Sequence, residues 1–228
     1  MTPEEILKDP IVLLAEDYAT KAHEAIGQRR KYTGDSYIIH PRNVAVAFAN
    51  AEIARHRHGI EGVAAAFLHD VVEDVVRHEK NSEAERNRRL AEMYDLFPPQ
   101  TMQFVMEVTN IATAADGPRR VRAEINMRHI VSATPYSASI KYADINDNLE
   151  NMIKNDREFS YVYFPEKAAV LTNANQGDRG LYLRAIAACL EGMQTLLPAA
   201  SPRHRLPLQN GIKNLLDRQA ALWAQHSF

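Results

Sequence analysis

Apolar residues recur every three or four positions along most of the chain, a spacing that predicts helices. Between residues 10 and 26 they trace one helical face: Ile11, Leu14, Tyr18 and Ala22. The same spacing predicts further helices over 40–51, 60–75, 101–111, 119–133, 136–153, 166–173, 179–196 and 208–225. Strong alternation of apolar and polar residues, which would indicate strands, is not found. We therefore expect an all-α, multi-helix globular domain.

Breaks between these segments suggest how the chain is divided. Residues 77–90 are dense in charge and are expected to form an exposed loop and helix. Pro198 and Pro202 should stop the helix that ends near residue 196. We predict that residues 1–196 form the main domain and that residues 197–228 form a C-terminal helical extension packed on it.

Composition limits the class of protein. A chain of 228 residues with 46% hydrophobic residues suits one large domain. A net charge of -2 argues against a general nucleic-acid binder, although a local basic pocket could still hold a small anion. The single cysteine, Cys189, excludes an internal disulfide and a multi-cysteine zinc site, which fits a reducing compartment.

No signal peptide and no membrane span are expected. The N-terminus carries acids where a signal peptide has bases, and no apolar stretch approaches the roughly 20 residues that a span needs. We expect a soluble, cytoplasmic protein whose partner is a small molecule, neither nucleic acid nor membrane. The sequence leaves the oligomeric state open, with a homodimer as one alternative.

One histidine and three carboxylates interrupt an apolar helix. His69 and Asp70 follow the apolar run 64–68, where ionisable groups are costly to bury unless they are paired or bound to a metal. Glu73 and Asp74 come three and four residues after Asp70 and so share its helical face. Carboxylates this close repel one another unless a cation lies among them.

Ion pairing offers a simpler explanation for part of this cluster. Arg77 and His78 lie one turn beyond Glu73 and Asp74 and could pair with them. Asp70, however, has no basic residue three or four positions away. A metal at Asp70 with an acid–base carboxylate beside it therefore explains the cluster better, and imidazole with carboxylate suits Mn²⁺, Fe²⁺ or Zn²⁺.

A second polar line lies on a later predicted helix. Four residues recur there at helical spacing: Lys141, Asp144, Asn148 and Asn151. They could form a solvated face or part of a site. Asp147 and Glu150, at other positions, already supply a solvated face, which favours the site.

A basic loop precedes the second predicted helix. Arg30 and Lys31 could pair with phosphate, and Tyr32 could stack on a base. An ordinary exposed turn would contain the same residues, so this loop alone leaves both interpretations open.

Together the three segments resemble the hydrolase domain of RelA/SpoT-type alarmone enzymes, especially the free-standing, metazoan-type small alarmone hydrolases. The family pattern is A-H-x-x-x-G-Q-x-R-K-x-x-G-x-x-Y-x-x-H-P, then L-H-D-x-x-E-D, then K-x-A-D-x-x-x-N. The matching residues are Ala22-His23, Gly27-Gln28, Arg30-Lys31, Gly34, Tyr37, His40-Pro41, Leu68-His69-Asp70, Glu73-Asp74, Lys141, Ala143-Asp144 and Asn148. The match covers about residues 15 to 155 in the family's order.

The resemblance implies an all-α HD fold and one divalent metal, usually Mn²⁺. By position it makes the metal ligands His40, His69, Asp70 and Asp144, and it assigns Glu73 and Asp74 to the attacking water and its proton. It places the following residues at the nucleotide: Arg30, Lys31, Tyr32, Lys141, Asn148 and Asn151. The implied reaction removes the 3′-diphosphate of guanosine tetra- or pentaphosphate as pyrophosphate. His23 is expected to pack beside the site.

The chain departs from the family at positions around the site. Val75 replaces a common Thr, Asn110 a Lys and Ile145 an Arg, and residues 77–90 form a longer charged insertion. None is an implied ligand, but the change at Ile145 bears on substrate identity. One alternative is therefore a phosphatase acting on another 2′- or 3′-phosphorylated nucleotide, such as NADPH or a 3′-phosphoadenosine compound. A nucleotide-binding protein without turnover is the other, and the intact acidic pair argues against it.

Overall fold

The computed structural model describes residues 1–150 and 152–224. Within these residues no β-strand forms, and the expected all-α class is confirmed. The helices are α1 (Pro3–Leu7), α2 (Pro10–Ala25), α3 (Ile39–Ala49), α4 (Gly59–Leu68), α5 (Glu83–Leu96), α6 (Pro99–Val108), α7 (Arg119–Val131), α8 (Pro135–Leu149), α9 (Met152–Asn155), α10 (Arg157–Asn173), α11 (Arg179–Leu196) and α12 (Pro202–Ala224).

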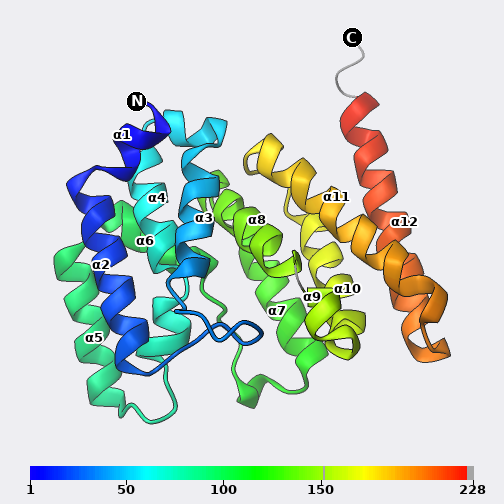
Figure 1. Ribbon diagram of the computed structural model, residues 1–228, viewed down its shortest axis with the longest axis horizontal. Helices are drawn as coiled ribbons and strands as arrows, with labels where there is room; N and C mark the ends of the chain where they lie inside the picture. The colour runs from blue at the N-terminus through cyan, green and yellow to red at the C-terminus, as the bar shows by residue number, and fades with distance from the viewer. Residues whose placement is uncertain (151, 225–228) are drawn as a thin grey trace.

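Two helices occupy the centre of the fold. α4 packs against α2, α3 and α6, while α8 packs against α3, α6 and α11. In Figure 1, α1–α6 lie on one side of α8, and α10–α12 lie on the other. Site residues carried by α4 or α8 therefore stand inside the protein, between its two halves.

α4 is apolar on every side, as a helix must be when neighbours surround it. Residues 62–68 are all buried. Gly62 lets α3 approach closely, because a Cβ there would lie 2.6 Å from ring atoms of Phe48, which is itself fully buried. This contact fixes the distance between the helix that carries His40 and the one that ends at His69.

The predicted helix over 60–75 is interrupted, contrary to the sequence pattern. α4 ends at Leu68, and Val71–Val76 form a π-helical turn in which Arg77 N donates to Val72 O at 3.0 Å. In this segment two valines stand on each side of the Glu73-Asp74 pair, a pattern that fits an α-helix or a π-helix. A wider turn directly after a helix commonly marks a functional site.

Two later helices begin earlier than predicted. The helix expected from residue 166 starts at Arg157, because Asp156 accepts a hydrogen bond from Phe159 N at 3.1 Å and caps it, with Pro165 inside. The helix expected from residue 208 starts at Pro202 and contains Pro207. Burial on neighbouring helices outweighs the break that a proline would cause in isolation.

The C-terminal helix packs on the rest of the domain. α12 lies against α10 and α11, with Leu208 and Leu215 fully buried. The proposed boundary near residue 196 stays a prediction, and residues 225–228 of that extension lie outside the described part. No helix in the described ranges is long and apolar enough to cross a membrane.

We expect Gly62→Ala to destabilise the protein, because its methyl group would press on the Phe48 ring. Overpacking typically costs about 1–3 kcal/mol, which exceeds the up to ~1 kcal/mol that alanine gains in a helix. Val46→Ala, on the exposed face of α3, is the control and should change the free energy of unfolding by less than about 0.5 kcal/mol. Urea denaturation measures both. Equal stability of Gly62→Ala and wild type would contradict the proposed close contact.

Candidate active site

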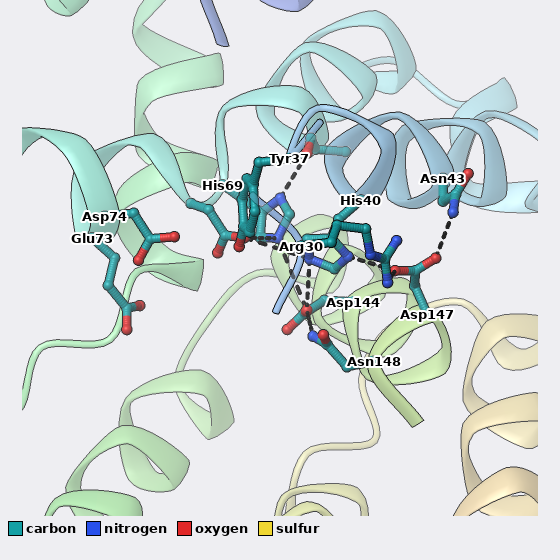
Figure 2. Close-up of polar contacts among 12 residues, drawn as sticks. Arg30, Tyr37, His40, Asn43, His69, Glu73, Asp74, Asp144, Asp147 and Asn148 are labelled. Carbon is teal, nitrogen blue, oxygen red and sulfur yellow. Dashed lines mark hydrogen bonds and ion pairs between the residues drawn. The ribbon is translucent and has the colours of Figure 1, made fainter. Parts of the chain in front are cut away.

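The four side chains implied as metal ligands come together from different helices. His40 lies in the first turn of α3, His69 and Asp70 directly follow α4, and Asp144 lies on α8. The two imidazoles and Asp144 are almost completely buried. Figure 2 shows His40, His69 and Asp144 converging on one point.

The distances within this cluster are short. His40 Nε2 lies 3.4 Å from Asp70 Oδ2 and 3.3 Å from Asp144 Oδ1. His69 Nε2 lies 3.2 Å from Asp70 Oδ2 and 3.9 Å from Asp144 Oδ1. Ligand atoms of His40, His69 and Asp70 all fall within 4.8 Å of one another, a spacing that could hold a metal ion. Asp144 is outside that tightest set but faces both imidazoles.

The hydrogen bonding of His69 points to a cation. Its Nδ1 donates to the carbonyl oxygen of Ala66 at 2.8 Å, so a neutral ring presents the lone pair of Nε2 to the cluster. That Nε2 is buried and has no hydrogen-bond partner. A buried nitrogen without a partner is costly, and a metal ion would satisfy it.

Electrostatics supports the same conclusion. Burial alone lowers the pKa of His40, but three neighbouring carboxylates raise it well above its usual value. Burial raises the pKa of Asp70, but the charges of His69 and His40 hold it well below its usual range. The cluster is thus stable only with added positive charge, from protons on the imidazoles or from a cation. The mixed nitrogen and oxygen donors fit a divalent metal.

Two residues predicted to touch substrate contact the Asp144 carboxylate. Lys141 Nζ lies 2.8 Å from Asp144 Oδ2, and Asn148 Nδ2 donates to Asp144 Oδ1 at 2.5 Å. Both lie on the same face of α8 as Asp144. They fix the direction of this carboxylate, and their contact with a substrate stays a prediction. Asn151, predicted on the same face, lies outside the described residues.

Asp74 is held by a chain of amide and imidazole groups. Gln28 Nε2 donates to Asp74 Oδ2 at 2.7 Å, and Gln28 Oε1 accepts from His23 Nδ1 at 2.7 Å. His23 thus lies beside the site, and its ring packs on that of Tyr37. Burial, followed by the charge of Asp70, raises the pKa of Asp74 to about 7. A carboxyl group with this pKa can take or give a proton near neutral pH.

Glu73 is oriented from the end of α6. Asn110 Nδ2 contacts both oxygens of Glu73, at 2.8 and 3.0 Å, and the backbone N–H of Asn110 lies 3.4 Å from one of them. Arg77, considered in the sequence as a partner for the acids, donates to the Asn110 carbonyl instead. Figure 2 shows Glu73 and Asp74 together on one side of His69.

The basic loop lines a cavity of about 560 Å³ that reaches His40. Lys31 pairs with Asp156 at 2.7 Å and lies over the rings of Tyr32 and Phe159. Tyr163 and Asn148 also line this cavity. This cavity offers aromatic faces and cations beside the ligand cluster. A larger hollow of about 960 Å³ between α3, α8 and α11 contains no member of the cluster.

Several residues at the site were missed by sequence reasoning. Phe159 and Tyr163 were hidden because α10 was expected to begin after Pro165. Asp147 was assigned to a solvated face, yet it accepts a hydrogen bond from His40 Nδ1 at 2.7 Å. Asn110 was noted only as a departure from the family. Hydrophobic spacing could not reveal these contacts, since each joins distant segments.

Comparisons with known proteins find similarity in sequence and in structure. No family model matches the chain. A curated relative, guanosine-3′,5′-bis(diphosphate) 3′-pyrophosphohydrolase from Aquifex aeolicus (strain VF5), is 28% identical over 138 residues, which is 60% of this chain. The chain spans only 17% of the length of that relative.

A solved structure of a metazoan ortholog of SpoT, described as hydrolysing ppGpp, superposes with a TM-score of 0.66. It is 24% identical and covers 83% of this chain and 98% of its own. The chain has the fold of this SpoT ortholog. Both comparisons support the resemblance to RelA/SpoT-type hydrolases that the motifs indicated.

We expect a divalent cation to stabilise the protein through this cluster. At a concentration of about 100 times its Kd, a ligand stabilises the folded state by about 2.7 kcal/mol, which for a chain of this size raises the Tm by roughly 5–10 °C. His69→Ala should abolish the rise in Tm, whereas His56→Ala, an exposed histidine, should retain it. Differential scanning fluorimetry with and without EDTA provides the measurement. An equal rise in both variants would rule out this cluster as the binding site.

Proposed function

We propose that this chain is a metal-dependent pyrophosphohydrolase that removes the 3′-diphosphate of guanosine tetra- or pentaphosphate, with Mn²⁺ as its metal. The observation that carries this proposal is the buried ligand cluster with an unpartnered His69 Nε2, next to the acidic pair Glu73 and Asp74. The reaction itself is suggested by the names of the Aquifex relative and of the metazoan SpoT ortholog.

His40, His69, Asp70 and Asp144 would hold the metal. A divalent ion bound there supplies Lewis acidity to phosphoryl oxygens and to water. The protein's own contribution is the fixed direction of each ligand. Tyr37 Oη donates to Asp70 Oδ2 at 2.7 Å, and Lys141 holds Asp144 from behind.

Glu73 and Asp74 would handle protons. A water oxygen bonds to the phosphorus next to the ribose 3′ oxygen, the bond from that phosphorus to the 3′ oxygen breaks, and the leaving oxygen takes up a proton. Asp74, with a pKa of about 7, suits this exchange. Asn110 holds Glu73 so that its carboxylate stays beside Asp74.

The nucleoside would lie in the cavity of about 560 Å³. Tyr32, Phe159 and Tyr163 present rings on which a base can stack, and Lys31 offers a charge to the 5′-phosphates. Arg30 lines the same cavity, but its guanidinium is bonded to Asp147 at 2.9 Å.

The departing diphosphate would lie toward a smaller cavity of about 90 Å³, lined by Lys141, Lys167 and Asn110. Lys167 has no ion pair or hydrogen bond among the described residues, and its ammonium group lies over the Tyr163 ring. Burial, followed by the charge of Lys141, lowers the pKa of Lys167 to about 8. An anion between these lysines would satisfy both.

Incubation with Mn²⁺ and guanosine tetraphosphate tests the reaction. We expect GDP and pyrophosphate, separated by anion-exchange chromatography. Loss of a general acid–base group typically lowers the rate by about 10²–10⁴-fold. The rate of hydrolysis by Glu73→Gln and by Asp74→Asn should therefore fall by a factor in that range. Arg157→Gln, an exposed change at the start of α10, serves as the control and should retain activity.

Either of two outcomes would overturn the assignment. Orthophosphate from NADPH or a 3′-phosphoadenosine compound, without turnover of guanosine tetraphosphate, would make the chain a phosphatase of another nucleotide. Binding of the nucleotide with no hydrolysis in any metal would make it a binding protein.

Inhibition by products tests the placement of the diphosphate. Lys167→Met should raise the inhibition constant of pyrophosphate about tenfold, the loss expected for one charge-assisted hydrogen bond, and leave that of GDP unchanged. Lys213→Met, which removes an exposed lysine on α12, is the control. A wild-type inhibition constant for pyrophosphate in Lys167→Met would show that this lysine does not bind the leaving group.

A further inference from the structure

We propose that Asp147 is a positioning residue that orients His40 as a metal ligand. This inference rests on the metal site of the proposed function. His40 Nδ1 donates to Asp147 Oδ2 at 2.7 Å. A carboxylate can only accept here, so the proton of the neutral imidazole is placed on Nδ1 and the lone pair on Nε2.

The direction of that lone pair is the important consequence. His40 Nε2 faces Asp70 and Asp144, at 3.4 and 3.3 Å. The other tautomer would turn an N–H toward the cluster and could not bind a metal. Histidines that bind metals usually donate their second N–H to a carboxylate or carbonyl, which fixes the ring and makes the free nitrogen more basic.

α8 holds this ring at both nitrogens. Asp144 and Asp147 are three residues apart and so share a helical face. One carboxylate lies near Nε2 of His40 and the other accepts from Nδ1. Figure 2 shows Asp147 on the far side of His40 from His69, away from the ligand cluster.

Asp147 is itself fixed by donors from two other segments. Arg30, in the basic loop, donates to its Oδ2 at 2.9 Å, and Asn43, on α3, donates to its Oδ1 at 2.7 Å. Its side chain is 8% exposed. With His40, these donors occupy both carboxylate oxygens, so Asp147 cannot rotate without losing several bonds. Arg30 thus contributes to the orientation of His40 through its hydrogen bond to Asp147.

The two imidazoles of the cluster are oriented by different groups. His69 donates to a backbone carbonyl, which carries no net charge, whereas His40 donates to a carboxylate. His40 should therefore be the more basic nitrogen donor. Of the two imidazoles, only His40 loses a hydrogen-bond partner when Asp147 is substituted, which makes the effect on the ring measurable.

Metal affinity and tautomer together test the inference, without any substrate. Loss of such a partner typically weakens metal binding about 10–100-fold, so Asp147→Ala should raise the Kd for Mn²⁺ by that factor in calorimetric titration. Asp147→Asn, which keeps the size and one acceptor, should show a smaller rise. In the metal-free protein, at a pH high enough for His40 to be neutral, ¹⁵N chemical shifts of His40 should show protonated Nδ1 in wild type and a mixture of tautomers in Asp147→Ala.

Glu150→Ala is the matched control, since it removes an equal charge at the end of α8 from an exposed side chain. Its Kd for Mn²⁺ should stay near that of wild type. Should Asp147→Ala fail to fold, the Kd and tautomer of Asp147→Asn decide. Wild-type values in the Asp147 variants, or an equal loss in Glu150→Ala, would overturn the inference. A wild type that binds no Mn²⁺ would overturn it too. A wild type that binds Mn²⁺ but does not hydrolyse the alarmone would remove the proposed reaction alone.

Discussion

Charge balance in the buried space between α3, α4 and α8 is the constraint on which the rest of the structure depends. Two imidazoles and two carboxylates lie there within about hydrogen-bond distance, and a further carboxylate stands behind one imidazole. Such a group is costly to bury without compensating charge. Lys141 and Arg30 supply part of it, and the remaining demand is met by protons or by a cation.

The surrounding helices restrict the positions of these side chains. The apolar helix α4 ends directly before His69, and Gly62 allows α4 to pack closely on α3. The π-helical turn then directs the acids that follow toward the end of α6, where Asn110 receives Glu73. The packed helices thus hold the histidines and Asp144, and the π-helical turn carries Glu73 and Asp74.

The sequence predicted the parts of the fold that depend on local spacing. Helices with regular apolar faces were predicted near their true positions, because burial of one face determines both the spacing of apolar residues in the sequence and the extent of the helix. The π-helical turn was not predicted, because the order of its valines and acids fits an α-helix as well as a π-helix. The start of α10 was missed because the cap at Asp156 and the packing around Pro165 depend on neighbours.

The sequence likewise predicted the central residues of the site but not the contacts that support them. Motifs brought His40, His69, Asp70 and Asp144 together through a family resemblance, and the structure places them in one cluster. Their supporting contacts could not be read in the same way. Asp147 reaches His40 across 107 positions of sequence, and Asn110 reaches Glu73 across 37. A helical face is visible in a sequence, but what lies opposite it is not.

The link from His23 through Gln28 to Asp74 has a further consequence. An amide side chain donates at one end and accepts at the other, yet it does not pass a proton between them. Gln28 therefore insulates Asp74 from the imidazole behind it. A proton that Asp74 gains or loses would therefore have to come from another neighbour than His23.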